Sequence, residues 1–169
     1  MNNQLTRRKF IRTATVGAVS VAVLPQFLAS CSSNKKSGSE KNEDGITRLG
    51  FIGLGQQGIG LLGAFLSIAG VEVVAGSDVY GIKRERFIKR LNDHYASQQK
   101  NVAVDVYENY KDLLVREDID AVVIATPDHW HAFIAIDACK AKKHIYLEKP
   151  LTFTIKEGQE LVKAVRENN

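Results

Sequence analysis

The feature that most constrains this chain is a glycine-rich stretch, GLGQQG, at residues 53–58. It follows a short apolar run, ITRLGFIG (46–53), that is typical of a strand. It leads into a second apolar run, GIGLLGAFLSIAG (58–70), that is typical of a buried helix ending at a glycine. A strand, a tight glycine turn and a helix in this order predict the first unit of a parallel α/β sheet.

Strand-like and helix-like segments alternate through the rest of the chain. The strand-like segments are residues 71–77, 102–107, 119–126 and 144–148, and the helix-like segments are residues 81–96, 109–118, 128–143 and 155–168. Nearly continuous apolar strands between helices indicate a parallel sheet that is covered on both faces. With right-handed crossovers, the predicted fold class is α/β, a Rossmann-like doubly wound parallel sheet.

The last helix, over residues 155–168, carries two local signals. Thr154 followed by Glu157 is the pattern of a capping box, which would begin the helix. An apolar stripe is the face that such a helix normally turns toward the core. The stripe is expected at Ile155, Leu161, Val162 and Val165.

The glycine loop suits a dinucleotide. Gly53 can make the tight turn, Gly55 lets the backbone approach a pyrophosphate, and Gly58 lets helix and strand pack closely. Gln56 and Gln57 complete the loop where the helix opens, and the helix N-terminus offers N–H groups and a partial positive charge to phosphates. These five residues are therefore predicted to bind the cofactor.

Asp78 lies 20 residues after Gly58, at the end of the second predicted strand. An acid at this position binds the ribose 2′-OH of NAD, and its charge would repel the 2′-phosphate of NADP. Lys83 and Arg84 follow closely and could soften that discrimination. We therefore expect NAD as the cofactor, with NADP less favoured. The alternative is a glycine-rich turn followed by a solvated aspartate.

Two further loops are expected at the same edge of the sheet. TPDHWH (126–131) follows the most apolar strand, and EKP (148–150) ends the next strand. In an open parallel sheet, ligands bind beyond the carboxyl ends of the strands, near the point where the strand order reverses. The glycine loop and the loop at 126–131 should lie side by side at that point.

Taken together, GLGQQG, Asp78, TPDHWH and EKP resemble the Gfo/Idh/MocA family of NAD(P)-dependent oxidoreductases, in that order and at similar spacing. The resemblance covers residues 46–169. It implies a reaction in which hydride moves between nicotinamide and a carbinol carbon of a sugar, an inositol or a related polyol. Asp128 stands where the family usually has asparagine, which adds a charge near the cofactor.

The resemblance also implies roles for the residues of these loops. Those expected to border the dinucleotide or its riboses are Thr126, Pro127, His131 and Glu148. Lys149 would be catalytic, because its ammonium group would stabilise the negative charge that develops on an alcohol oxygen. Pro150 limits where Lys149 can point. The alternatives are a surface lysine at a strand end and a histidine at 131 that only caps or packs.

The first 45 residues are expected to lie outside this domain. A basic head with Arg7 and Arg8 precedes an apolar run that is too short to span a membrane, so residues 1–30 are predicted to be a twin-arginine signal peptide. Cys31 resembles the acylated cysteine of a lipoprotein, and polar residues to 45 form a flexible linker. We expect export to the periplasm or to a lipid-anchored membrane site. The alternative is an uncleaved amphipathic N-terminus.

Charge and cysteine content restrict the partners. Of the 23 Lys and Arg residues, four lie within residues 1–30, which leaves 19 basic residues against 19 acidic ones. The positive net charge therefore gives no reason to expect a nucleic-acid partner. Cys139 is left without a second cysteine and no Cys/His cluster has zinc spacing, so we predict no metal site and a packing role for this thiol.

The family that the chain resembles has a second, larger domain that covers the substrate, often builds oligomers and supplies an acid/base histidine. The sequence ends at Asn169, so we expect only the NAD-binding half, as a fragment or a truncated gene, with weak NAD binding and little turnover. One alternative is an NAD-dependent glycoside hydrolase or lyase of the same family, a branch that tends to lack the EKP lysine but is typically exported. Another is a non-catalytic nucleotide-binding remnant.

Overall fold

The computed structural model describes residues 45–168. The predictions made for the signal peptide, for Cys31 and for nearly all of the linker lie outside the described residues. None of the helices in the described part combines the length and the apolar character that a membrane span requires.

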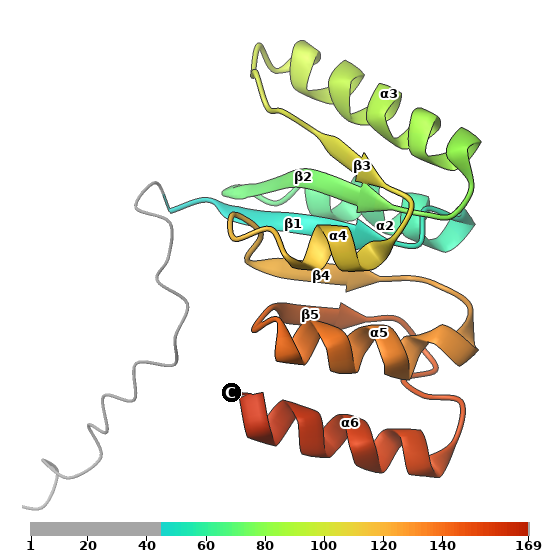
Figure 1. Cartoon of the computed structure of the whole chain (residues 1–169). Helices are drawn as coiled ribbons and strands as arrows, with labels where there is room; N and C mark the ends of the chain where they lie inside the picture. Colours follow the sequence, from blue (N-terminus) through green and yellow to red (C-terminus); the bar gives the residue numbers. More distant parts are fainter. Residues whose placement is uncertain (1–44, 169) are drawn as a thin grey trace, which may run out of the picture. The chain divides into compact units, whose positions relative to one another are not determined.

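In this part of the chain, five parallel strands form one sheet, and the helices alternate with them (Figure 1). The strands are β1 (Thr47–Ile52), β2 (Val71–Ser77), β3 (Asp105–Tyr107), β4 (Ala121–Ile124) and β5 (His144–Leu147). The helices are α2 (Gln56–Leu66), α3 (Gly81–Ser97), α4 (Tyr110–Leu114), α5 (Asp128–Lys140) and α6 (Ile155–Asn168). The strand order is β3-β2-β1-β4-β5, and every neighbouring pair is parallel. The predicted Rossmann-like fold is confirmed.

Helices cover both faces of the sheet, which explains why its central strands are almost wholly apolar. On one face, Leu62 of α2 and Phe87 of α3 pack against side chains of β1, β2 and β4. On the other face, Leu113 of α4 and Ile134 of α5 pack against alternate side chains of the same strands. Each face thus has its own apolar cluster, and the sheet lies between them (Figure 1).

The pairing of β1 with β2 shifts by one residue between Leu49 and Gly50. At this irregularity the Tyr95 hydroxyl accepts a hydrogen bond from the Val73 N–H at 2.7 Å and donates one to the Val73 carbonyl at 3.1 Å. Burial raises the pKa of Tyr95, which keeps the hydroxyl in the form that can donate. The side chain of α3 therefore supplies hydrogen bonds to β2 where the ladder is disturbed.

Helix α2 begins and ends earlier than the predicted span of residues 58–70. It begins at Gln56, directly after Gly55, so the second half of the glycine loop is already helical. It ends at Leu66, because both the N–H and the hydroxyl of Ser67 bond to the Ala64 carbonyl. The boundary thus depends on a side-chain hydrogen bond that the apolar pattern does not show.

The capping box expected before α6 is present. The Glu157 N–H donates to the Thr154 hydroxyl at 3.2 Å, and the Thr154 N–H donates to the Glu157 carboxylate at 3.0 Å. The same carboxylate also accepts a hydrogen bond from the Phe153 N–H at 2.8 Å. These bonds occupy backbone donors that a helix start leaves without intrahelical partners.

The apolar stripe expected on α6 does not face the core as a whole. Ile155 is 86% exposed, Val162 50% and Val165 37%, so the prediction is wrong for these three residues. Leu161 packs against the core and Ala164 is buried. The reason is that α6 lies beside α5, so the described residues cover only a narrow strip of its surface (Figure 1).

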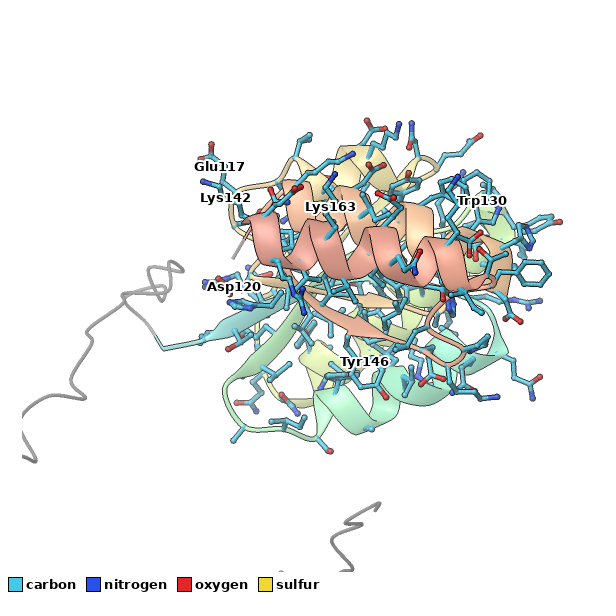
Figure 2. The ribbon with its side chains drawn as sticks, turned by 90° about the horizontal axis from the view of Figure 1, so that it is seen from below. Glu117, Asp120, Trp130, Lys142, Tyr146 and Lys163 are labelled. Atoms are coloured by element: carbon cyan, nitrogen blue, oxygen red, sulfur yellow. The ribbon has the colours of Figure 1, made fainter. Side chains whose placement is uncertain are left out.

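Two side chains of α5 differ in their burial. Cys139 is buried on α5, and burial raises the pKa of its thiol, as suits a packing role. Trp130 is 48% exposed and is therefore not part of the core of the described domain. Figure 2 shows it at the end of the domain opposite Asp120 and Glu117.

Candidate functional site

The site lies at the edge of the sheet where the strands have their carboxyl ends. The strand order reverses between β1 and β4, which are paired, so the loops that follow these two strands are neighbours. A Cβ atom added to Gly53 would lie 2.6 Å from the Ala125 carbonyl oxygen and 2.9 Å from the Thr126 nitrogen. The two loops therefore lie side by side, as the sequence predicts.

Glycine is required at two positions of the loop for different reasons. Gly53 has φ +92, a backbone conformation that L side chains rarely adopt, and it has no room for a Cβ atom. A Cβ atom on Gly58 would overlap the Gly53 carbonyl oxygen, so only glycine lets the first turn of α2 pack against β1. The tight turn and the close packing expected at these two glycines are both present.

Gly55 has a different environment. It is the N-cap of α2, and a Cβ atom added there would meet nothing within 4 Å. The space in front of the helix N-terminus is therefore open, and the N–H groups of the first helical turn have no carbonyl of their own helix to bond. Gln56 and Gln57 begin the helix with exposed side chains. This arrangement can bind the negative charge of a phosphate group.

Asp78 directly follows β2, and its side chain is only 7% exposed. One carboxylate oxygen accepts a hydrogen bond from the Leu54 N–H at 2.9 Å and lies 3.3 Å from the Lys83 ammonium. The other accepts from the Tyr80 N–H at 3.0 Å. The acid that was predicted to bind the ribose is thus held directly beside the glycine loop.

His131 joins the two later loops. Its imidazole is 1% exposed, with Nδ1 2.6 Å from the Pro150 carbonyl oxygen and Nε2 2.9 Å from the Thr126 carbonyl oxygen. The loop after β4 and the loop after β5 are therefore connected through one buried ring. Because both nitrogens have backbone partners here, a direct contact of His131 with the cofactor stays a prediction.

Thr126 contributes a buried polar atom without a partner. Its hydroxyl oxygen has no hydrogen-bond partner among the described residues. A buried hydroxyl left in this state costs about 1–3 kcal/mol, so a ligand that bonded to it would recover that free energy. The next two residues, Pro127 and Asp128, are exposed, and Asp128 stabilises the first turn of α5 by its negative charge.

The EKP loop places two charged side chains at the same edge. The Glu148 N–H donates to the Ile124 carbonyl at 3.0 Å, and its carboxylate accepts from the Tyr146 hydroxyl at 3.3 Å. Lys149 is exposed, and its ammonium has no partner among the residues from 45 to 168. The Lys149–Pro150 peptide bond is cis. Lys149 is therefore available to a ligand.

A cavity of about 460 Å³ extends from the glycine loop to α3. It is lined on one side by Leu54, Gly55, Gln56 and Ile59, and on the other by Lys83, Arg86 and Arg90. Sequence reasoning pointed to Lys83 and Arg84 but missed Arg86 and Arg90. The signal was available, since basic residues spaced three and seven positions after Lys83 share one face of a helix.

A second hollow, of about 560 Å³, lies at the other end of the domain, where Glu117 and Lys142 appear in Figure 2. Its most buried cations already have partners. Lys143 donates to the carbonyls of Arg116 and Ile119, and Arg116 pairs with Asp118 at 2.6 Å. Burial lowers the pKa of Lys143, and the hydrogen bond to Asp118 raises the pKa of Arg116. We interpret these contacts as structural.

The residues of the carboxyl edge fit a dinucleotide. Gly55 leaves open space before a helix N-terminus, Asp78 presents a carboxylate beside it, and Thr126 has a buried hydroxyl that lacks a partner. A pyrophosphate, a ribose and a further polar group of the ligand are what these three features would bind.

Known proteins match this chain over most of its length. A family model described as "Oxidoreductase family, NAD-binding Rossmann fold" matches residues 47–169. A glycosyl hydrolase family 109 protein of Shewanella sp. (strain W3-18-1) is 32% identical over 175 residues. An alpha-N-acetylgalactosaminidase of Shewanella oneidensis is 31% identical over 176 residues. Each alignment covers 95% of this chain but only 37% of the relative, so the chain spans little more than a third of their length.

Among solved structures, a 3-ketoreductase from Actinomadura kijaniata, crystallised with NADP and TDP-benzene, is similar with a TM-score of 0.62 and 29% identity. The similarity covers 73% of this chain and 35% of the reductase. The likeness is therefore to part of that protein, in agreement with the alignments to the curated relatives.

Proposed function

This chain belongs to the Gfo/Idh/MocA family of oxidoreductases, and on that premise we propose that residues 46–169 are the NAD-binding half of an exported enzyme. That enzyme would move hydride between nicotinamide and a sugar, an inositol or a related polyol. The observation that carries the proposal is the position of Asp78, whose carboxylate bonds to the Leu54 N–H of the glycine loop. The residue expected to bind the ribose therefore lies beside the loop expected to bind the pyrophosphate.

Each part of the cofactor has a candidate binding residue. The backbone at Gly55 and Gln56 would bind the pyrophosphate, since the helix N-terminus there is open. The Asp78 carboxylate would accept hydrogen bonds from ribose hydroxyls. Thr126, with its unpartnered buried hydroxyl, and Glu148, directly after β5, would border the remainder of the dinucleotide.

Lys149 is the residue that we propose to act on the substrate. When bound, the nicotinamide would accept or return a hydride. Lys149 would stabilise the negative charge on the substrate oxygen, and it is exposed and unpartnered within the described chain, as this role requires. Its loop is fixed to the loop after β4 through His131.

Export is the part of the proposal that rests on the sequence alone. Arg7, Arg8 and Cys31 support a twin-arginine lipoprotein signal. A route that carries folded proteins would let the domain leave the cytoplasm with its cofactor bound. Periplasmic or membrane-anchored localisation is proposed on that basis, and globomycin-sensitive processing of a tagged chain would test it.

A second candidate is an NAD-dependent glycoside hydrolase. Two relatives at 31–32% identity carry the names of a glycosyl hydrolase family 109 protein and an alpha-N-acetylgalactosaminidase, which favours it. The lysine of the EKP loop argues against it, because that branch tends to lack it. A third candidate is a nucleotide-binding protein without catalytic activity.

The three candidates give different products. The purified chain is first titrated with NAD and NADP in a calorimeter, and binding of neither dinucleotide would overturn the proposal. The full-length protein that contains this domain is then incubated with NAD and a panel of polyols and N-acetylgalactosaminides. Net formation of NADH supports a dehydrogenase, whereas glycoside cleavage without net NADH supports the hydrolase.

Substitution of the proposed catalytic lysine separates an enzyme from a binding protein. In the same full-length protein, Lys149→Ala should leave NAD binding within about twofold and lower turnover on the order of 100-fold, because a charge-stabilising group is lost. A binding protein without activity would show no turnover in either form.

A further inference from the structure

Three basic residues of α3 face the glycine loop. Lys83, Arg86 and Arg90 all line the cavity of about 460 Å³ that begins at Gly55. Their spacing of three and four residues places them on one side of the helix. The cavity therefore has the helix N-terminus of α2 at one end and a row of cations along its wall.

Lys83 pairs with Asp78, but the protein does not balance the charges of the two arginines in this cavity. Within the described chain, none of the cavity-lining residues is acidic, and neither Arg86 nor Arg90 takes part in an ion pair. Other cations of the same helix do have partners, since Arg84 pairs with Glu108 and Lys89 with Asp93.

Neighbouring like charges on a helix destabilise it by about 0.2–0.5 kcal/mol per pair, and an anion bound between them would remove that cost. Two arginines without ion pairs that line an open cavity are therefore typical of a site for an anionic group. Arginine in particular suits phosphate, which it can bind through two parallel hydrogen bonds.

The negative charge of Asp78 is already compensated. Its carboxylate accepts two backbone hydrogen bonds and lies 3.3 Å from the Lys83 ammonium. The repulsion that a lone carboxylate would exert on a phosphate nearby is reduced accordingly. The Asp78 carboxylate can thus accept a hydrogen bond from a ribose hydroxyl without excluding a phosphate from the adjoining cavity.

We propose that Arg86 and Arg90, with Lys83, form a subsite for the 2′-phosphate of NADP, so that this domain accepts NADP as well as NAD. The inference rests on the dinucleotide site of the proposed function. The ribose is expected at Asp78, and the cations begin five residues further along the chain at Lys83, whose ammonium contacts that carboxylate. A phosphate on the ribose 2′-oxygen would therefore enter the cationic side of the cavity.

Two other roles for Arg86 and Arg90 can be distinguished from a subsite for the 2′-phosphate. They could attract the pyrophosphate that NAD and NADP share, or stack on the adenine ring that both contain. Either role would make their loss affect both cofactors equally. A subsite for the 2′-phosphate predicts instead that NADP is affected and NAD is not.

The test is a calorimetric titration of the full chain with NAD, NADP, 5′-AMP and 2′,5′-ADP. The last two ligands differ only in the 2′-phosphate. The wild-type chain should bind NADP with a dissociation constant within tenfold of that for NAD. A variant with Arg86→Gln and Arg90→Gln should bind NADP and 2′,5′-ADP at least tenfold more weakly, while NAD and 5′-AMP change less than twofold.

Lys89→Gln is the matched control, because Lys89 lies on the same helix outside the cavity and should leave all four affinities unchanged. All three replaced side chains are exposed, and thermal melts will show that the variants stay folded. Binding of NAD without NADP, or an equal loss of both in the double variant, would overturn the inference. Binding of neither dinucleotide would instead overturn the proposed function on which it rests.

Discussion

The Asp78 carboxylate accepts a hydrogen bond from the Leu54 N–H at 2.9 Å, which ties the acid at the end of β2 to the glycine loop at the end of β1. The loop and the acid are separated by an entire helix in the sequence, yet they form one local structure. A hydrogen bond to an ionised group contributes about 1.5–3 kcal/mol. The site is therefore organised before any ligand arrives.

Replacement of this carboxylate should change which cofactor is preferred. We expect Asp78→Asn to weaken NAD binding about tenfold, because an amide accepts hydrogen bonds from ribose hydroxyls less strongly than a carboxylate does. NADP should lose less, since a negative charge beside its 2′-phosphate is removed. Calorimetric titration measures both affinities. Asp93→Asn, an exposed position on α3, is the control and should change neither.

Gly55 and Gly60 allow a matched test of where phosphate binds. A Cβ atom meets nothing within 4 Å at either position, so neither Gly55→Ala nor Gly60→Ala creates a clash within the described chain. Gly60→Ala should stabilise α2 by up to about 1 kcal/mol and leave NAD binding unchanged. Gly55→Ala should leave the free energy of unfolding within about 1 kcal/mol but weaken NAD binding at least tenfold. Urea denaturation and calorimetry measure the two effects.

One result for Gly55→Ala would contradict pyrophosphate binding at that residue. If Gly55→Ala bound NAD as tightly as the wild-type chain, the pyrophosphate would not approach the backbone at that residue. The open space in front of α2 would then need another explanation.

The features that the sequence predicts correctly are those with local causes. The glycine turn at Gly53 follows from its backbone conformation and from the close approach of Ala125. The start of α6 follows from Thr154 and Glu157, which bond to each other's backbone. Parallel strands have continuous apolar sequences, so the parallel sheet and the edge at which the loops meet also follow.

The features that the sequence does not predict depend on which helices and loops pack against each other in the folded domain. The apolar spacing of α6 does not reveal that Ile155 is 86% exposed, because that depends on α6 lying beside α5. The two backbone partners of His131 come from loops 5 and 19 residues away, which no motif encodes. The cavity at Arg86 and Arg90 exists only once α3 lies against the glycine loop.

Loss of the His131 ring should uncouple the two loops that it joins. We expect His131→Ala to lower the free energy of unfolding by about 1–3 kcal/mol, because a buried ring that hydrogen-bonds to a backbone carbonyl of a neighbouring loop is lost. His129→Ala, at an exposed position two residues earlier, should change it by no more than about 0.5 kcal/mol. Urea denaturation compares the variants. Equal effects of the two substitutions would show that the buried ring does not stabilise the loops.

Tyr110 should make the stability of the domain depend on pH in the alkaline range. Its hydroxyl donates to the Asp137 carboxylate at 2.8 Å and so links α4 to α5. Burial, and then the hydrogen bond to Asp137 and its charge, raise the pKa of Tyr110 to about 12. In the unfolded chain the pKa of a tyrosine is about 10. Folding therefore favours the protonated hydroxyl.

Because the pKa of Tyr110 is higher in the folded state, its contribution to stability is complete below about pH 10 and is lost as the pH rises toward about 12. Tyr110→Phe removes both the hydrogen bond and the titrating group. We therefore expect the variant to be less stable than the wild-type chain at pH 8 and 9, and the difference in the free energy of unfolding to narrow between pH 10 and 11.5. Urea denaturation of both proteins across this range measures it, and a difference that stayed constant would show that Tyr110 does not titrate with a raised pKa.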